Sequence, residues 1–421
     1  MKRLLAAILA FAAACAEVPS GPDPIKLDFP EIQRFKGESP GPAARPNSEI
    51  ALDFIDLAFR MESGRELPRL TRFQGPITVR VVGRFSQTTL DDLTALLRRL
   101  RTEARIDISL TNDPEANIVI EAVPNRTLQR VAPNAACFVV PRVQTWGELR
   151  AARNSPVINW ATLESREKAA IFIPSDITPQ EIRDCLHEEL AQALGPLNDL
   201  YRLPDSVFND DNIHAVLTGF DMLILRAYYD PELRNGMTKQ QVAQRLPGIL
   251  GRLNPRGQRT GGRIPSTTSR AWIDAMTVAL GDGASEPRRR QAAARAVAIG
   301  QSLGWTGPRE GFANYAYGRL QIGNDAVLSL GAFNAARRAY SQSPITDIHA
   351  AHISVQLAAF TLIARDADRT IAITSPAIEI ARRHENAALM ALLMMFKAEA
   401  LDIKGDTEAA TALRMDSLGW G

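Results

Sequence analysis

The chain has 421 residues, of which 45% are hydrophobic and 23% are charged. These proportions are typical of a globular protein with two or three domains, and they exclude a disordered or fibrous chain. The 49 basic and 47 acidic residues give a formal net charge of +2, and no long basic stretch stands out. Nucleic acid is therefore not an expected partner.

The first residues have the pattern of an export signal. Lys2 and Arg3 precede an apolar run that ends at residue 14 and is too short to cross a bilayer, which needs about 20 residues. Small residues then stand directly before Cys15, as in bacterial lipoprotein signals. Residues 1–14 are therefore predicted to be a signal peptide, with lipid attached to Cys15. Secretion with an incidental cysteine is the alternative.

The predicted location is the periplasm, with the lipid anchor in the outer membrane. Ala16 follows Cys15, in place of the Asp that would indicate retention at the inner membrane. Residues 15–47 are rich in proline and glycine, which leave no room for a helix or a central strand, so we expect a tether there.

Export also changes the interpretation of the two remaining cysteines. An oxidising compartment favours a disulfide between Cys137, in a short apolar strand, and Cys185, in a helix. Two free buried thiols are the alternative.

Residues 48–253 mix strands and helices, which predicts an α+β domain with a mixed sheet. Alternating and continuous apolar runs predict five strands, at 76–82, 106–110, 117–123, 136–140 and 169–173. Helical periodicity predicts helices at 48–61, 88–100, 179–194, 215–228 and 239–253.

The helix at 179–194 is the most informative element. Thr178 and Glu181 form a capping pattern at its start, and Gly195 marks its end. Glu189 falls within the apolar stripe, where burying a charge costs several kcal/mol unless it is compensated. Glu189 is thus a candidate for a raised pKa and a functional role, the alternative being a glutamate that reaches solvent or is hydrogen-bonded in the core.

The same helix resembles that of the metzincin zinc proteases, whose motif is His-Glu-x-x-His-x-x-Gly-x-x-His. In the register set by Gly195, the catalytic glutamate of that motif corresponds to Glu189. The three zinc-ligand positions hold Glu188, Gln192 and Asn198 instead of histidine. The resemblance implies a metzincin-like fold with an altered site.

Two further segments extend this resemblance. Phe208 stands where the methionine of the metzincin Met-turn would stand, and residues 116–120 are similar to a strand of those enzymes. His187 is out of register, because the residue four positions later is Ala191.

A narrower resemblance covers about residues 65–250. Segments 185–199 and 204–211, together with 67–81 and 229–237, resemble the bacterial lipoprotein family called domain of unknown function 2927. The family implies a metzincin-like fold and no established activity. The departures at the ligand positions argue against zinc-dependent peptidase chemistry.

We expect the cleft to hold no metal and no cofactor. Zinc favours histidine nitrogen and cysteine sulfur, whereas two carboxamides and one carboxylate suit calcium or no ion. A rearranged metal site using His214, Asp199, Asp210 and Asp211 is the alternative. The cluster 210–212 is otherwise interpreted as a solvated turn, or as a cap for a helix beginning near His214.

The remaining sequence is predicted to be helical. Residues 254–286 form a linker with one helix at 269–280, and Ala-rich amphipathic segments of residues 287–421 begin near 288, 310, 326, 347, 368 and 386. Near the end, Ala398, Gly405-Asp406 and Ala410 match the spacing of a tetratricopeptide hairpin. A tetratricopeptide-like all-α domain is expected, with a plain helical bundle as the alternative.

Two functions fit these observations. The first is a binding module without enzymatic activity, in which the metal-free cleft takes a peptide or protein of the cell envelope. The second is a hydrolase with Glu189 as general base, assisted by Glu188 or Gln192.

Overall fold

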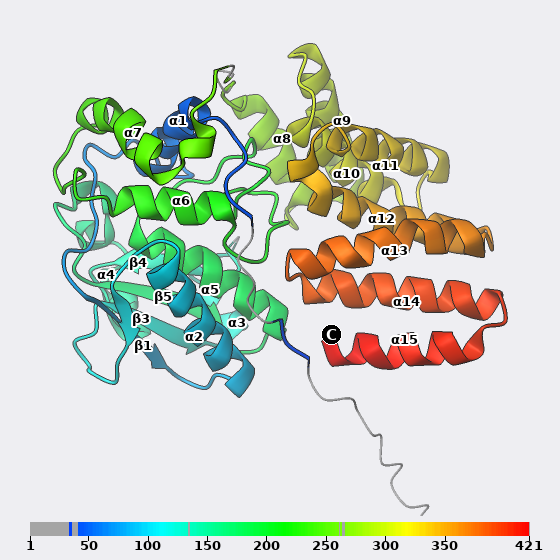
Figure 1. Cartoon of the computed structure of the whole chain (residues 1–421), viewed down its shortest axis with the longest axis horizontal. Coiled ribbons are helices and arrows are strands. Elements are labelled where there is room, and N and C mark those ends of the chain that lie inside the picture. The colour runs from blue at the N-terminus through cyan, green and yellow to red at the C-terminus, as the bar shows by residue number, and fades with distance from the viewer. Residues whose placement is uncertain (1–32, 36–40, 134, 261, 263–265, 421) are drawn as a thin grey trace, which may run out of the picture.

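A computed structural model describes residues 33–35, 41–133, 135–260, 262 and 266–420. It has two parts, a five-stranded mixed sheet with helices and a C-terminal region of consecutive helices (Figure 1). The predicted class, α+β followed by all-α with helical hairpins, is confirmed.

The sheet has the strand order β2-β1-β3-β5-β4. β1 (Ile77–Val82), β2 (Ile108–Leu110), β3 (Ile118–Val123) and β5 (Ala169–Pro174) are parallel, and β4 (Phe138–Pro141) pairs antiparallel with β5 at one edge. All five strands coincide with predicted ones. β4 is therefore an outer strand with β5 as its partner in the described sheet.

Both faces of the sheet are covered. Alternate residues of β5 face opposite sides, so Ile171 and Ile173 enter the main core while Ala170 and Phe172 enter a second cluster. The main core packs against α2 (Gln87–Thr102) and α5 (Pro179–Leu194). The second cluster is closed by α3 (Asn125–Leu128), α4 (Trp146–Ala152) and η1 (Pro156–Ile158), with η2 (Trp160–Thr162) beside them.

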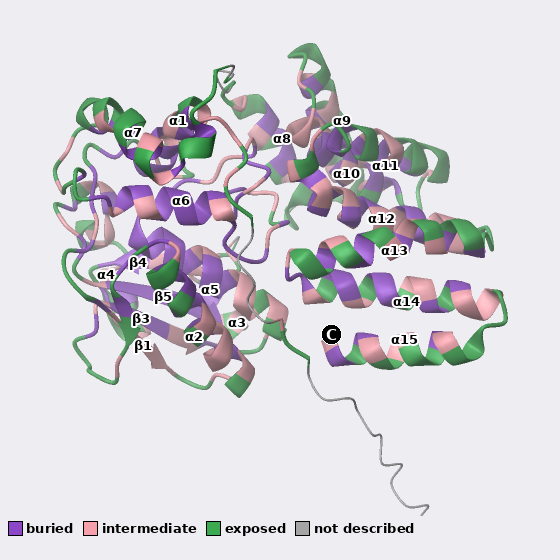
Figure 2. Ribbon diagram, viewed as in Figure 1, coloured by how far each residue is buried: buried purple, intermediate pink, exposed green. Residues whose placement is uncertain are grey.

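Three more helices complete the main core: α1 (Asn47–Ala58), α6 (Gly219–Tyr228) and α7 (Lys239–Leu253). α6 is almost wholly buried (Figure 2). It begins at Gly219 and not near residue 214 as predicted, because Thr218 and Asp221 form a capping box there. The apolar residues before Thr218 thus belong to a buried loop, which apolar content alone does not distinguish from a helix.

The C-terminal region is a series of helices that pair with their neighbours in sequence (Figure 1). After η3 (Pro255–Gly257) come α8 (Arg270–Leu280), α9 (Glu286–Ser302), α10 (Pro308–Gln321), α11 (Ala326–Tyr340), η4 (Pro344–Thr346), α12 (Asp347–Ile363), α13 (Ala367–Arg383), α14 (Ala387–Ile403) and α15 (Thr407–Trp420). The predicted segment starts are matched within a few residues. Gly405, with φ of +84°, makes the last predicted turn between α14 and α15.

The two parts are joined by loops that follow α5. The ring of Tyr201 lies 4.9 Å from that of Trp272 on α8, and Ile213 is buried among side chains of α12–α14. On α5 itself, Arg183 donates to the carbonyl of Glu385 at 2.8 Å and pairs with its carboxylate. The helical region is therefore packed directly against the loops beyond α5.

A disulfide joins Cys137 to Cys185, with a Cα–Cα distance of 5.9 Å. The predicted pairing is thereby confirmed in the structure. The bridge ties the start of β4 to the middle of α5, so it fixes the spacing between the edge strand and the helix.

The predicted signal peptide and Cys15 lie outside the described residues, as does most of the predicted tether. None of the described helices has the length and apolar content that crossing a membrane requires.

Replacing Cys137 and Cys185 together by alanine should lower the free energy of unfolding by ~3–4 kcal/mol, because the bridge closes a loop of 48 residues. Urea denaturation of the two proteins measures this difference, with the reduced wild type as a control for the loss of side-chain volume. Two free thiols in the exported wild-type protein would contradict the expectation.

Candidate functional site

The site is organised by α5, which is fixed at both ends. At its start, Thr178 and Glu181 form the predicted capping box. At its end, the buried guanidinium of Arg166 donates to the carbonyls of Gln192 at 2.6 Å and Ala193 at 2.7 Å, and also to that of Gly195. Trp160 packs on the same guanidinium at 4.8 Å. A cation at the C-terminal end of a helix satisfies its unpaired carbonyls and its dipole.

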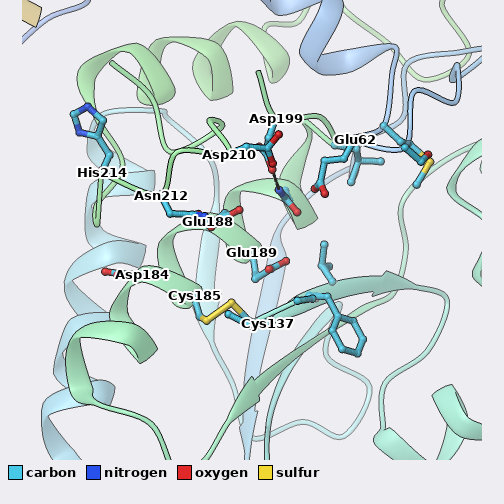
Figure 3. Close-up of a pocket in the computed structure, with 18 of the residues that line it drawn as sticks. Glu62, Cys137, Asp184, Cys185, Glu188, Glu189, Asp199, Asp210, Asn212 and His214 are labelled. Atoms are coloured by element: carbon cyan, nitrogen blue, oxygen red, sulfur yellow. Dashed lines mark hydrogen bonds between the residues drawn. A yellow bond between two sulfur atoms is a disulfide. The ribbon is translucent and has the colours of Figure 1, made fainter. Parts of the chain in front are cut away.

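A cavity of about 630 Å³ lies beside α5 and the start of β4 (Figure 3). Seven of the residues that line it carry carboxylates: Glu62, Glu181, Asp184, Glu188, Glu189, Asp199 and Asp210. His214 also lines the cavity, and none of its described lining residues is Lys or Arg. Phe138, Val139 and Trp160 form its apolar wall.

The structure brings together only some of the residues predicted for the cleft. Glu188, Glu189 and Gln192 line the cavity, and Glu189 is only 4% exposed. Asn198 is not among the lining residues, because its amide donates to the carbonyl of Asp56 at 3.0 Å. Asp199 takes that place, and it accepts a hydrogen bond of 3.3 Å from Gln192.

Two other predicted residues support the cleft from behind. Phe208 is fully buried in the main core, and its carbonyl accepts from the amide of Leu200 at 3.0 Å. Gly195 lies against Tyr228, whose ring would be 3.0 Å from an added Cβ. A side chain at residue 195 would therefore displace Tyr228.

The histidines have structural partners. The Nδ1 atom of His187 accepts from the amide of Leu217 at 3.0 Å, so its place beside Glu188 is unrelated to a metal motif. His214 bonds to the carbonyl of Pro204 at 2.8 Å. Asp211 was interpreted from the sequence as part of a solvated turn or a helix cap, but its side chain is buried and pairs with His349 at 3.0 Å.

Burial strongly perturbs the cavity carboxyls. Desolvation raises the pKa of Glu188 to about 8, with Glu62 and Asp210 adding like charge. Desolvation likewise raises the pKa of Glu189 and of Asp199 well above their usual range, and Glu188 is the strongest source of charge repulsion for both. It raises the pKa of Asp184 and of Asp210 to about 7. Since neither Lys nor Arg is among the described lining residues, protonation of the carboxyls relieves their repulsion.

Sequence reasoning missed Glu62, Asp184 and Arg166. Glu62 lies in the turn after α1, far from the motif in sequence, and no local pattern marks it. Asp184 directly precedes Cys185 on the helix, so the predicted disulfide could have indicated that Asp184 lies near the cleft. Arg166 is a loop arginine without a motif of its own.

Residues 47–248 match a family model described as a protein of unknown function, DUF2927. The chain carries a DUF2927 domain. The match confirms the family that the sequence motifs indicated, and it includes the sheet, α5 and every residue that lines the cavity. The helices from α8 onwards lie outside the matched segment. No curated protein matches the chain.

Asp184→Asn should raise the melting temperature at pH 8 by several degrees, and the gain should nearly disappear at pH 4. The pKa of Asp184 is raised from 3.8 to about 7, so between these values the folded protein holds a proton that the unfolded chain has lost, and stability falls as pH rises. The amide removes this cost and can still accept the 2.6 Å hydrogen bond from Gln180.

Thermal melts of both proteins at the two pH values test this, with Asp282→Asn, at an exposed position, as the control. A gain of the same size at pH 4 and pH 8 would contradict titration of Asp184 as its cause.

Proposed function

We propose that this DUF2927 protein is an exported, lipid-anchored peptide- or protein-binding module of the cell envelope. Its binding surface is a metzincin-like cleft that lacks the zinc-ligand set of those proteases. An extended segment of the partner adds to the edge of the sheet at β4, beside α5.

The observation that carries this proposal is the position of β4 at the edge of the sheet. An outer strand has main-chain donors and acceptors directed away from its partner strand, and these can pair with an added strand. Residues 135–139, at the start of β4, line the cavity, so a peptide on this edge would also contact the cavity. The disulfide holds this edge at a fixed spacing from α5, which reduces the ordering cost of binding.

The second candidate is a hydrolase with Glu189 as general base. The buried position of Glu189 on α5 favours this role. However, burial raises its pKa well above the usual range, which disfavours the ionised carboxylate that a general base requires. The zinc-ligand positions Gln192 and Asn198 carry amides, and Asn198 is engaged with Asp56. These points favour binding over hydrolysis.

The anchoring part of the proposal is tested at Cys15. Cys15→Ser should move the protein from the membrane fraction to the soluble periplasm, because the serine hydroxyl replaces the thiol that would carry the lipid. Cell fractionation with immunoblotting measures the shift, and substitution of the neighbouring Glu17 by Gln serves as the control. An unchanged membrane association of Cys15→Ser would exclude this anchor.

The binding part is tested with peptides selected by the purified protein from a random displayed library. Ala136→Trp should lower the affinity for the selected peptides by at least about tenfold, or ~1.4 kcal/mol. Ala136 is exposed and lines the cavity beside β4, so a bulky side chain there would obstruct the peptide. Ala151→Trp is the matched control, at an exposed position on α4 away from the cavity. Fluorescence anisotropy gives the affinities.

Glu189→Gln should leave these affinities nearly unchanged, since main-chain hydrogen bonds to β4 do not involve its carboxyl. Peptides that bind Ala136→Trp as well as the wild type would contradict the proposal. Cleavage of the selected peptides that is abolished by Glu189→Gln would support the hydrolase instead.

A further inference from the structure

The cavity concentrates negative charge that the protein does not balance. Its described lining includes seven carboxylates and neither Lys nor Arg, although the whole chain has a formal charge of +2. The Glu181 carboxylate is used by the helix cap, but the others have no cationic partner among the lining residues. Protons or a bound cation must therefore balance this charge.

Three of the carboxylates converge at one point of the cavity. Glu62 comes from the turn after α1, Asp199 from the segment after α5, and Asp210 from the next loop (Figure 3). One oxygen of each lies within 4.8 Å of the others, which leaves room for a single ion between them. The Oδ1 atom of Asp199 is buried without a hydrogen-bond partner among the described residues, so it is free to bind an ion.

Glu189 provides a second, independent indication of a ligand. It comes from α5, is only 4% exposed, and lines the same cavity below the three converging carboxylates (Figure 3). Its Oε2 atom is buried without a hydrogen-bond partner among the described residues. A buried carboxylate oxygen is costly without a proton or a cation, and this one belongs to the lining of the cavity that holds the three carboxylates.

We propose that Glu62, Asp199 and Asp210 form a binding site for a divalent calcium ion, closed from below by Glu189. All the donors are carboxylate oxygens, and the two cysteines of the cavity are joined in a disulfide, so the site suits a hard cation better than zinc. Calcium lies 2.3–2.6 Å from its ligands, so two ligand oxygens can be ~5 Å apart. Magnesium, at about 2.1 Å, would need them to move closer together.

This site goes beyond the proposed peptide binding and does not rest on it. It also differs from the metal-free cleft that the sequence predicted, because the third carboxylate, Glu62, comes from outside the motif. The ion would link the turn after α1 to the two loops after α5, at the mouth of the cavity. Calcium sites of extracellular modules have dissociation constants of ~10⁻⁴–10⁻³ M, which is the affinity expected for a site with three carboxylates.

The test uses the exported full-length protein, stripped with chelator and titrated with calcium chloride at pH 8 by isothermal calorimetry. We expect one calcium per chain, a melting temperature that rises with calcium concentration, and weaker binding of magnesium chloride and zinc chloride. Asp199→Asn and Glu62→Gln should each weaken calcium binding at least about tenfold. Glu66→Gln is the matched control, because Glu66 is on the same exposed segment as Glu62 but outside the cavity. It should change the calcium affinity less than about twofold.

Glu62 is exposed, so its variant keeps the test decisive even where Asp199→Asn fails to fold. Absence of calcium binding up to about 10 mM would overturn the proposal. So would tighter binding of zinc than of calcium, or equal losses in Glu62→Gln and Glu66→Gln. Peptide binding at β4 can fail while calcium binding persists, so the two proposals are distinguishable.

Discussion

The contact between Arg166 and the end of α5 is the interaction on which the site most depends. A helix that ends inside a protein leaves carbonyls without partners, and a fully desolvated guanidinium satisfies three of them here. This contact fixes where α5 stops and therefore where Gly195 directs the chain. The direction taken after Gly195 brings Asp199 into the cavity and leaves Asn198 bound to Asp56. The chemistry of the cavity thus follows from how the helix ends.

Fixing α5 also brings several carboxylates together in one cavity. Glu188 and Glu189 are adjacent on the helix, and the disulfide one turn earlier prevents the helix from moving away from β4. Coulomb repulsion between such close groups grows as water is excluded, so the raised pKa values are a direct consequence of the packing. A structure that only needed stability would replace these groups with apolar ones. The ligands proposed above, a peptide at β4 and a calcium ion, would account for their presence.

The sequence predicted what depends on local periodicity. The five strands, the bounds of α5, the buried position of Glu189 and the Cys137–Cys185 pairing follow from patterns within short segments and from the oxidising compartment. The prediction failed beyond Gly195, where the motif placed Asn198 in the cleft. Asp199 lines the cavity instead, because Asn198 is hydrogen-bonded to Asp56, a residue of α1. Glu62 was missed for the same reason, since only the fold brings its turn to α5. The start of α6 was placed too early because a buried loop and a helix can have the same apolar content.

The loop that supplies the cavity also supplies the junction with the helical region. Asp199 and Asp210 face the cavity, while Tyr201 packs on Trp272 and Asp211 pairs with His349. These residues alternate along one short segment, so a shift of the segment towards a ligand would also move its contacts with α8 and α12. Arg183 joins α5 to Glu385 and adds a second link between the same two parts. The same segment therefore contributes both to the lining of the cavity and to the packing of the C-terminal helices, which lie outside the DUF2927 domain.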